Sequence, residues 1–199
     1  MKSETKKELI IRKSRDLFMR KGISRVTVKE IADNCGISKK TIYSYFDGKD
    51  ELTYEAIKEF LENVDDKIED IKNNDTLDFF GKIKEWLKFA KVNLFKMRQE
   101  FLEDIQKKHS ELWDMIEETR KKNINDLLYI IIKQGQEEGL VRKNVNIEFF
   151  ISLFYRNIVI LTDSEFVYKS GSSLKILINN FIDLFLNGIL VDRKKITID

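Results

Sequence analysis

Apolar residues recur at intervals of three and four from the beginning of the chain, which is the spacing of one face of an α-helix. The first such face contains Leu9, Ile10, Leu17 and Phe18, and charged residues fill the positions between them. The pattern stops at Gly22, because a glycine at this place readily adopts the backbone conformation that closes a helix. We therefore expect a first amphipathic helix that ends at Lys21.

Two shorter helices are predicted next. Thr27 and Glu30 have the spacing of a capping box, in which Thr27 bonds the amide of Glu30 and the Glu30 side chain bonds back to Thr27. The helix that Thr27 starts ends near Gly36 after about two turns. Ser38 then caps a third helix that we expect to run to about Tyr45.

The spacing within this pair of short helices is informative. A helix-turn-helix needs a small residue where its helices cross, a glycine in the turn, and an apolar residue that ties the second helix to the core. Ala32, Gly36 and Ile42 meet these three needs. An ordinary helical hairpin is the alternative, and it would share any one of these features by chance. The complete pattern favours a helix-turn-helix at about residues 27–46.

The remainder of the chain also shows helical patterning. There are no prolines and only 8 glycines among the 199 residues, so few positions interrupt a helix. Breaks at His109-Ser110, Glu138-Gly139 and residues 170–173 divide this region. The expected helices cover residues 49–72, 76–97, 99–108, 110–138, 147–163 and 172–190. The predicted fold class is all-α.

Charge distinguishes the beginning of the chain from the rest. Residues 1–50 contain 13 Lys and Arg against 7 Asp and Glu, whereas the whole chain has a net charge of only +2. A basic segment joined to a mildly acidic body indicates that this segment meets a polyanion. The exposed face of the third helix adds suitable chemistry, since lysines attract phosphates and hydroxyls bond phosphates or base edges.

One ordered, ungapped run of residues resembles the N-terminal signature of the tetracycline-repressor (TetR) family. The residues that carry the resemblance are Ile10-Ile11, Leu17-Phe18, Gly22, Thr27-Val28, Ile31-Ala32, Gly36-Ile37-Ser38, Thr41-Ile42-Tyr43, Tyr45-Phe46, Lys49 and Leu52. The departures are small: Lys13 and Ser14 stand where the family usually has alanines, and Lys40 where it often has glycine.

The resemblance implies a three-helix DNA-binding domain in residues 1–50 and a helical effector-binding and dimerisation domain in residues 51–199. It implies that Thr27, Tyr43 and Lys49 hold phosphates, that Tyr45 contacts DNA, and that Lys39, Lys40, Thr41 and Ser44 lie in or beside the major groove. The protein would then be a ligand-responsive transcriptional regulator, and a repressor that a small effector releases from its operator is the reading we favour.

The last two predicted helices are apolar around most of their circumference, and such helices must be covered on two sides. A second subunit is a suitable cover, because a four-helix interface with two-fold symmetry would pair two DNA-binding domains on a palindromic operator. We call the predicted DNA-binding domain, residues 1–50, the reader. The family dimerises through the same helices. The alternative is a monomer whose own core surrounds them.

An effector pocket is expected among the aromatic residues of the second domain. The candidates are Trp86, Phe89, Trp113, Phe154 and Tyr155. They suit a small molecule that is apolar or aromatic. Aromatic residues at helical spacing also form plain hydrophobic cores, so this alternative stays open for each of them.

No catalytic residue, metal ligand set or cofactor motif is expected. His109 is the only histidine and lacks a nucleophile beside it, and Cys35 is read as a small packed residue, with a redox-sensing thiol as the alternative. No segment of the sequence has the apolar length of a membrane span or signal peptide, so we expect a cytoplasmic protein that does not bind membranes. The main alternative function is a helical ligand-binding or interaction protein whose DNA reader is not functional. The sequence leaves open the operator, the effector, the regulated genes and the direction of the response.

Overall fold

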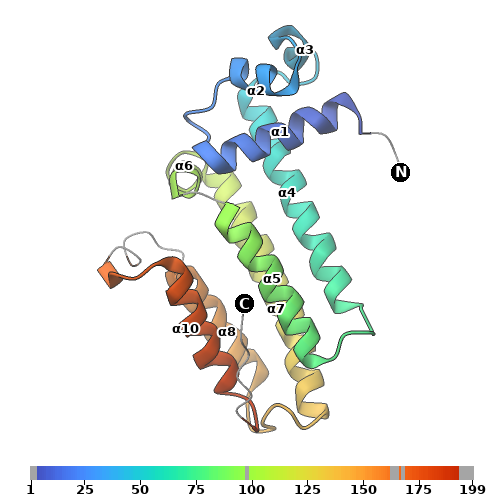
Figure 1. The fold of residues 1–199 in the computed structure, drawn as a ribbon, viewed down its shortest axis with the longest axis vertical. Helices are drawn as coiled ribbons and strands as arrows, with labels where there is room; N and C mark the ends of the chain where they lie inside the picture. Colours follow the sequence, from blue (N-terminus) through green and yellow to red (C-terminus); the bar gives the residue numbers. More distant parts are fainter. Residues whose placement is uncertain (1–3, 97–98, 162–165, 167–168, 193–199) are drawn as a thin grey trace. The chain divides into compact units, whose positions relative to one another are not determined.

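The computed structural model describes residues 4–96, 99–161, 166 and 169–192, and these parts of the chain are predominantly α-helical (Figure 1). The helices are α1 (Lys6–Lys21), α2 (Val28–Cys35), α3 (Lys39–Tyr43), α4 (Lys49–Lys72), α5 (Phe79–Lys96), α6 (Gln99–Lys108), α7 (Ser110–Glu137), α8 (Ile147–Leu161) and α10 (Leu174–Asn187). Within the described ranges, β-type pairing is limited to an isolated antiparallel bridge between Val141 and Leu190. The predicted all-α fold class is confirmed.

The predicted helix boundaries are close to the observed ones. Helix α4 has the bounds expected for it, and helices α5 to α10 begin and end within three residues of their predictions. Helix α3 is shorter than predicted, because it ends at Tyr43 and not at Tyr45. The Tyr45 amide donates to the Ile42 carbonyl, three residues back, so the chain tightens into a turn after α3.

The predicted caps are present, with one correction. Gly22 and Gly36 close α1 and α2 with φ of +84° and +68°, in the region that favours glycine. The Thr27 side chain accepts the Glu30 amide at 3.2 Å, as predicted. The Glu30 carboxylate, however, pairs with Lys21 at 2.5 Å instead of returning to the Thr27 amide. An opposite charge nearby competes successfully with a neutral amide donor.

The chain divides into two compact units. One unit contains residues 1–67 and 91–119, and the other contains residues 68–90 and 120–199. This division follows packing and differs from the functional division expected at residue 50, which stays a prediction. Helices α1, α2 and α3 lie entirely in the first unit, so the predicted DNA reader is a coherent part of it.

The core of the first unit joins the predicted reader to α6. Phe18, Ile42 and Phe46 from the reader are at most 2% exposed, and so are Phe101 and Ile105 from α6. Burying a large apolar side chain contributes roughly 1.5–3 kcal/mol, so this shared core holds the short helices in place. None of the helices in the described ranges is long and apolar enough to span a membrane.

Candidate nucleic-acid interface

Helix α3 is short, and its two ends are held so that one face remains outside. Ser38 caps its start by accepting the Thr41 amide at 3.1 Å. Ile42 lies 1% exposed in the core and anchors the inner face. Lys39 and Lys40 are exposed on the outer side, as the sequence predicts. This arrangement presents two ammonium groups to solvent from a helix start, where a phosphate is also favoured.

The hydroxyl groups on α3 are oriented by local hydrogen bonds. The Thr41 and Ser38 hydroxyl oxygens lie 3.0 Å apart and share a hydrogen bond. The Ser44 hydroxyl donates to the Thr41 carbonyl at 2.7 Å. Each of these oxygens retains acceptor capacity. Thr41 is half-buried and Ser44 is exposed, so their hydroxyls would differ in access to the major groove of a bound duplex.

Three further predicted residues are open to solvent. Tyr43 is 54% exposed and Tyr45 is 39% exposed, which is unusual for large aromatic residues beside a hydrophobic core. Thr27 is exposed at the start of α2, where it acts as the N-cap. Exposed tyrosine hydroxyls and a helix start both suit phosphate oxygens.

Lys49 differs from the other predicted DNA-binding residues. Its ammonium donates to the Ile23 carbonyl at 2.6 Å, and the residue is half-buried. Desolvation by burial lowers its pKa, although the carboxylates of Asp50 and Asp104 oppose this effect. Lys49 therefore holds the loop between α1 and α2 through one of the three N–H donors of its ammonium, and the phosphate contact that the resemblance implies for it stays a prediction.

The same loop is held from α6. The Asp104 carboxylate accepts the Ser24 amide and the Ser24 hydroxyl, each at 2.8 Å. Lys108 donates to the Ser24 hydroxyl at 2.8 Å and to Asp104 at 3.1 Å. A Cβ atom on Gly22 would lie 2.9 Å from an Asp104 carboxylate oxygen and would displace it, and the φ of +84° also favours glycine here. Sequence reasoning missed Asp104, since nothing local indicates its partner.

Comparison with known proteins identifies the N-terminal segment. Residues 10–56 match the family model of bacterial regulatory proteins of the tetR family, and this range contains the whole predicted helix-turn-helix. The chain therefore carries the N-terminal domain that is typical of tetR-family regulators. In the curated proteins, the regulator is 24% identical to the HTH-type transcriptional regulator YvaF of Bacillus subtilis over 89% of this chain and 92% of that protein.

Two other relatives extend the comparison. The regulator is 22% identical to the HTH-type transcriptional repressor KstR2 of Mycolicibacterium smegmatis, over 85% of this chain and 82% of that protein. It shares its fold with SmeT, the repressor of the SmeDEF multidrug efflux pump of Stenotrophomonas maltophilia, with a TM-score of 0.69. That likeness covers 97% of this chain and 95% of SmeT at 14% identity. SmeT has also been solved in complex with triclosan.

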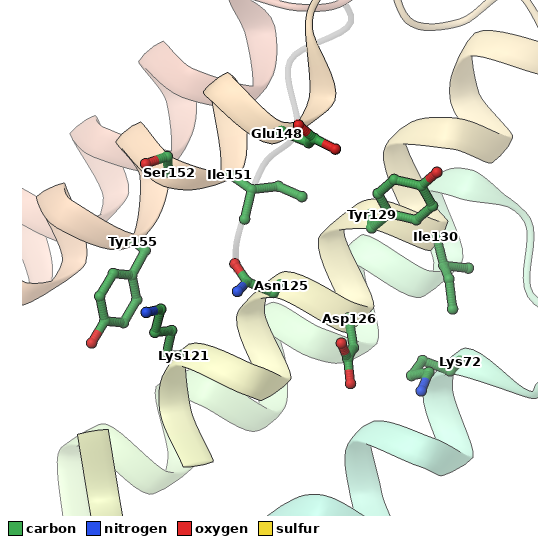
Figure 2. Close-up of a pocket in the computed structure, with 10 residues that line it drawn as sticks. All are labelled: Lys72, Lys121, Asn125, Asp126, Tyr129, Ile130, Glu148, Ile151, Ser152 and Tyr155. Carbon is green, nitrogen blue, oxygen red and sulfur yellow. The ribbon is translucent and has the colours of Figure 1, made fainter. Parts of the chain in front are cut away.

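The second unit of the regulator contains an open cleft of about 570 Å³ (Figure 2). Tyr129 on α7 and Tyr155 on α8 lie toward opposite sides of it, with Asn125 and Ile151 between them in this view. The full lining is Lys72, Lys121, Asn125, Asp126, Tyr129, Ile130, Glu148, Ile151, Ser152 and Tyr155. The cleft is therefore mixed in polarity, with both ammonium and carboxylate groups at its walls.

Of the five predicted pocket residues, Tyr155 is the one that lines this cleft. Trp86 and Phe154 instead pack against each other with ring centroids 5.5 Å apart, inside a cluster that continues to Phe181 on α10. Phe89 is half-buried on α5. Trp113 lies in the other unit, where it packs against the core that the reader shares with α6. That these five residues surround an effector stays a prediction.

Two other kinds of site were considered, a metal site and a reactive thiol. No group of three or more His, Cys, Asp or Glu side chains with the arrangement of a metal site occurs among the residues that the structure describes. Burial raises the pKa of the Cys35 thiol, and the nearby charges of Lys13 and Arg12 only partly oppose this. Since the thiolate is the reactive form, Cys35 is poorly suited to redox sensing.

Proposed function

We propose that this DNA-binding transcriptional regulator is a homodimeric repressor, which a small effector releases from its operator. The observation that carries the proposal is the outer surface of α2 and α3. There Lys39, Lys40 and Tyr43 are all exposed on α3, whose Ile42 is buried in the core. In the proposed complex these three residues, with Thr27, Thr41, Ser44 and Tyr45, contact the major groove and its phosphates.

The proposed dimer uses α8 and α10. Phe149 is 65% exposed on α8 and Leu184 is 72% exposed on α10, and Leu153, Ile160 and Ile176 on the same helices are also exposed. Large apolar side chains at such exposure are costly in water, so their number on these two helices supports an interface. Two-fold pairing would suit a palindromic operator whose half-sites lie about one turn of DNA apart, roughly 34 Å.

The proposed effector site is the cleft between α7 and α8. Tyr129, Tyr155 and Ile151 offer ring and apolar surface, whereas Lys121 and Glu148 offer charges that would orient a bound molecule. An effector with an apolar or aromatic body suits this lining. Helix α4 is the proposed lever, because it is continuous from the reader into the second unit. A coupling of about 1–3 kcal/mol between effector and DNA would be typical.

The proposal is tested by selecting duplexes from a random-sequence DNA pool with the purified full-length protein. We expect a recurrent palindromic sequence, bound with an affinity that falls steeply as salt increases. Replacing Lys39 and Lys40 with Glu should abolish the binding. Replacing Lys84, an exposed lysine on α5, with Glu should leave it unchanged. Failure to enrich any sequence would count against a DNA-binding role. Because such a role requires access to the operator, we also propose that the protein works in the cytoplasm.

A further inference from the structure

The two helices that line the cleft of the second unit place opposite charges at its two ends. At one end Lys121 on α7 lies toward Tyr155 on α8, and at the other end Tyr129 on α7 lies on the side of Glu148 on α8 (Figure 2). Lys121 precedes Tyr129 by eight positions and Glu148 precedes Tyr155 by seven. From the rise of an α-helix, the lysine and the glutamate are therefore separated by about 10–12 Å along the cleft.

The part of the cleft between these ends combines apolar surface with hydrogen-bonding groups. Ile151 on α8 is only 5% exposed and lies between the ends together with Asn125 on α7 (Figure 2). Ser152, which follows Ile151, adds a hydroxyl to the lining. The Asn125 amide both donates and accepts hydrogen bonds, and so does the Ser152 hydroxyl. This middle part suits a molecule that has an apolar group on one side and amides on the other.

One charge of each sign is available to a molecule lying between α7 and α8. Lys121 and Glu148 are both exposed, and neither belongs to an ion pair found in the described part of the chain. Two other charged residues also line the cleft. The Lys72 ammonium pairs with Glu69 at 2.6 Å at the end of α4, and Asp126 lies on the side of Lys72 and away from α8 (Figure 2).

We infer that the ligand of this cleft is a zwitterion, whose ammonium pairs with Glu148 and whose carboxylate pairs with Lys121, with an apolar or aromatic group between them. The inference rests on the proposed function for the role of this ligand as the effector. The ring of Tyr129 beside Glu148 also suits an ammonium, because the face of an aromatic ring attracts cations. A short peptide has the required chemistry, since three extended residues span roughly 10–11 Å and carry opposite charges at their ends.

The probes are the tripeptides Ala-Phe-Ala, Ala-Leu-Ala and Ala-Tyr-Ala, each with free ends, with an acetylated amino end, with an amidated carboxyl end, or with both ends blocked. Isothermal titration calorimetry with the full-length protein measures their binding without DNA. We expect at least one free peptide to bind with a Kd below about 5 mM. Blocking either end should weaken its binding about threefold or more, as for a partly exposed ion pair. If no free peptide binds, or if the doubly blocked form binds as tightly as the free form, the inference is overturned.

Variants of the protein assign each end of the peptide to its partner. In Lys121→Gln, amidation should no longer weaken binding, whereas acetylation still should. In Glu148→Gln, acetylation should lose its effect, whereas amidation should keep it. Lys133→Gln and Glu137→Gln are the matched controls, because both residues are exposed on α7 outside the cleft, and they should keep both effects. An amidation effect that persists in Lys121→Gln, or an acetylation effect that persists in Glu148→Gln, contradicts the inference.

The calorimetry separates this inference from the proposed function, because it needs no DNA. Fluorescence anisotropy with the duplex selected from the random pool then measures whether the free peptide releases the protein from DNA, and we expect release by the free form only. Selection of a duplex together with failure of the peptide measurements removes the inference alone. Peptide binding with the expected end effects supports the inference, and it then contradicts the proposed repressor function if the duplex stays bound or if no duplex is selected.

Discussion

Replacing Asp104 with alanine removes the acceptor that holds the loop between α1 and α2 against α6. Two donors from Ser24 each lie 2.8 Å from this carboxylate, whose side chain is only 13% exposed. A hydrogen bond to a charged group contributes about 1.5–3 kcal/mol to stability. Water can reach the freed Ser24 groups at the surface, so we expect a total loss of about 2–3 kcal/mol, which corresponds to a Tm lower by about 5–10 °C.

The charge of Asp104 gives this effect a characteristic pH dependence. Partial burial alone would raise its pKa, but the bonds from the Ser24 amide and hydroxyl and from Lys108 outweigh burial and hold the pKa below its ordinary value of 3.8. The carboxylate therefore stabilises the folded protein fully above that ordinary value, and the stabilisation is lost as the pH falls through the lower folded value. The difference in Tm between the unaltered protein and Asp104→Asn should narrow as the pH falls from about 7 to about 3.

Thermal and urea unfolding followed by circular dichroism would measure both effects. Asp104→Asn should be intermediate at neutral pH, because the amide keeps one acceptor oxygen but no charge. Asp114→Ala is the matched control, since Asp114 is an exposed acid on α7 in the same unit. An Asp104→Ala protein within about 0.5 kcal/mol of the unaltered protein would refute the reasoning, because surface substitutions commonly have effects of that size.

Three other predictions concern packing. Ser14 is fully buried and its hydroxyl has no hydrogen-bond partner, so Ser14→Ala should raise the free energy of unfolding by about 1 kcal/mol, as measured with urea; a loss of stability would contradict this. A Cβ on Gly135 would lie 2.6 Å from the Phe79 ring, so Gly135→Ala should lower stability by about 1–3 kcal/mol, and adding Phe79→Leu should recover part of that loss in a double-mutant cycle. Leu184→Asp and Phe149→Asp should each convert the proposed dimer to a folded monomer in sedimentation experiments, and an unchanged sedimentation coefficient would exclude α8 and α10 as the interface.

The local sequence was sufficient to predict the helices, including the short helices of the reader. Thr27, Gly36 and Ser38 act on backbone groups within a few residues of themselves, so their effects are visible as spacing. The turn-forming residues on either side of α4, Gly48 and Asn73, indicated its ends without reference to any distant contact. The end of α3 was predicted two residues too late, because the turn at Tyr45 depends on how Phe46 enters the core.

Only the tertiary structure decided which polar and aromatic side chains meet. Lys49 bonds to Ile23 across 26 positions, and Asp104 bonds to Ser24 across 80 positions. Trp113 packs against the core that the reader shares with α6, although an aromatic side chain suits a pocket as well as a core. A long side chain can reach several partners, and the choice among them depends on which elements lie beside it in space. The sequence by itself therefore determined the helices of this regulator and the exposed face of its predicted reader. The tertiary structure determined which polar and aromatic side chains contact one another.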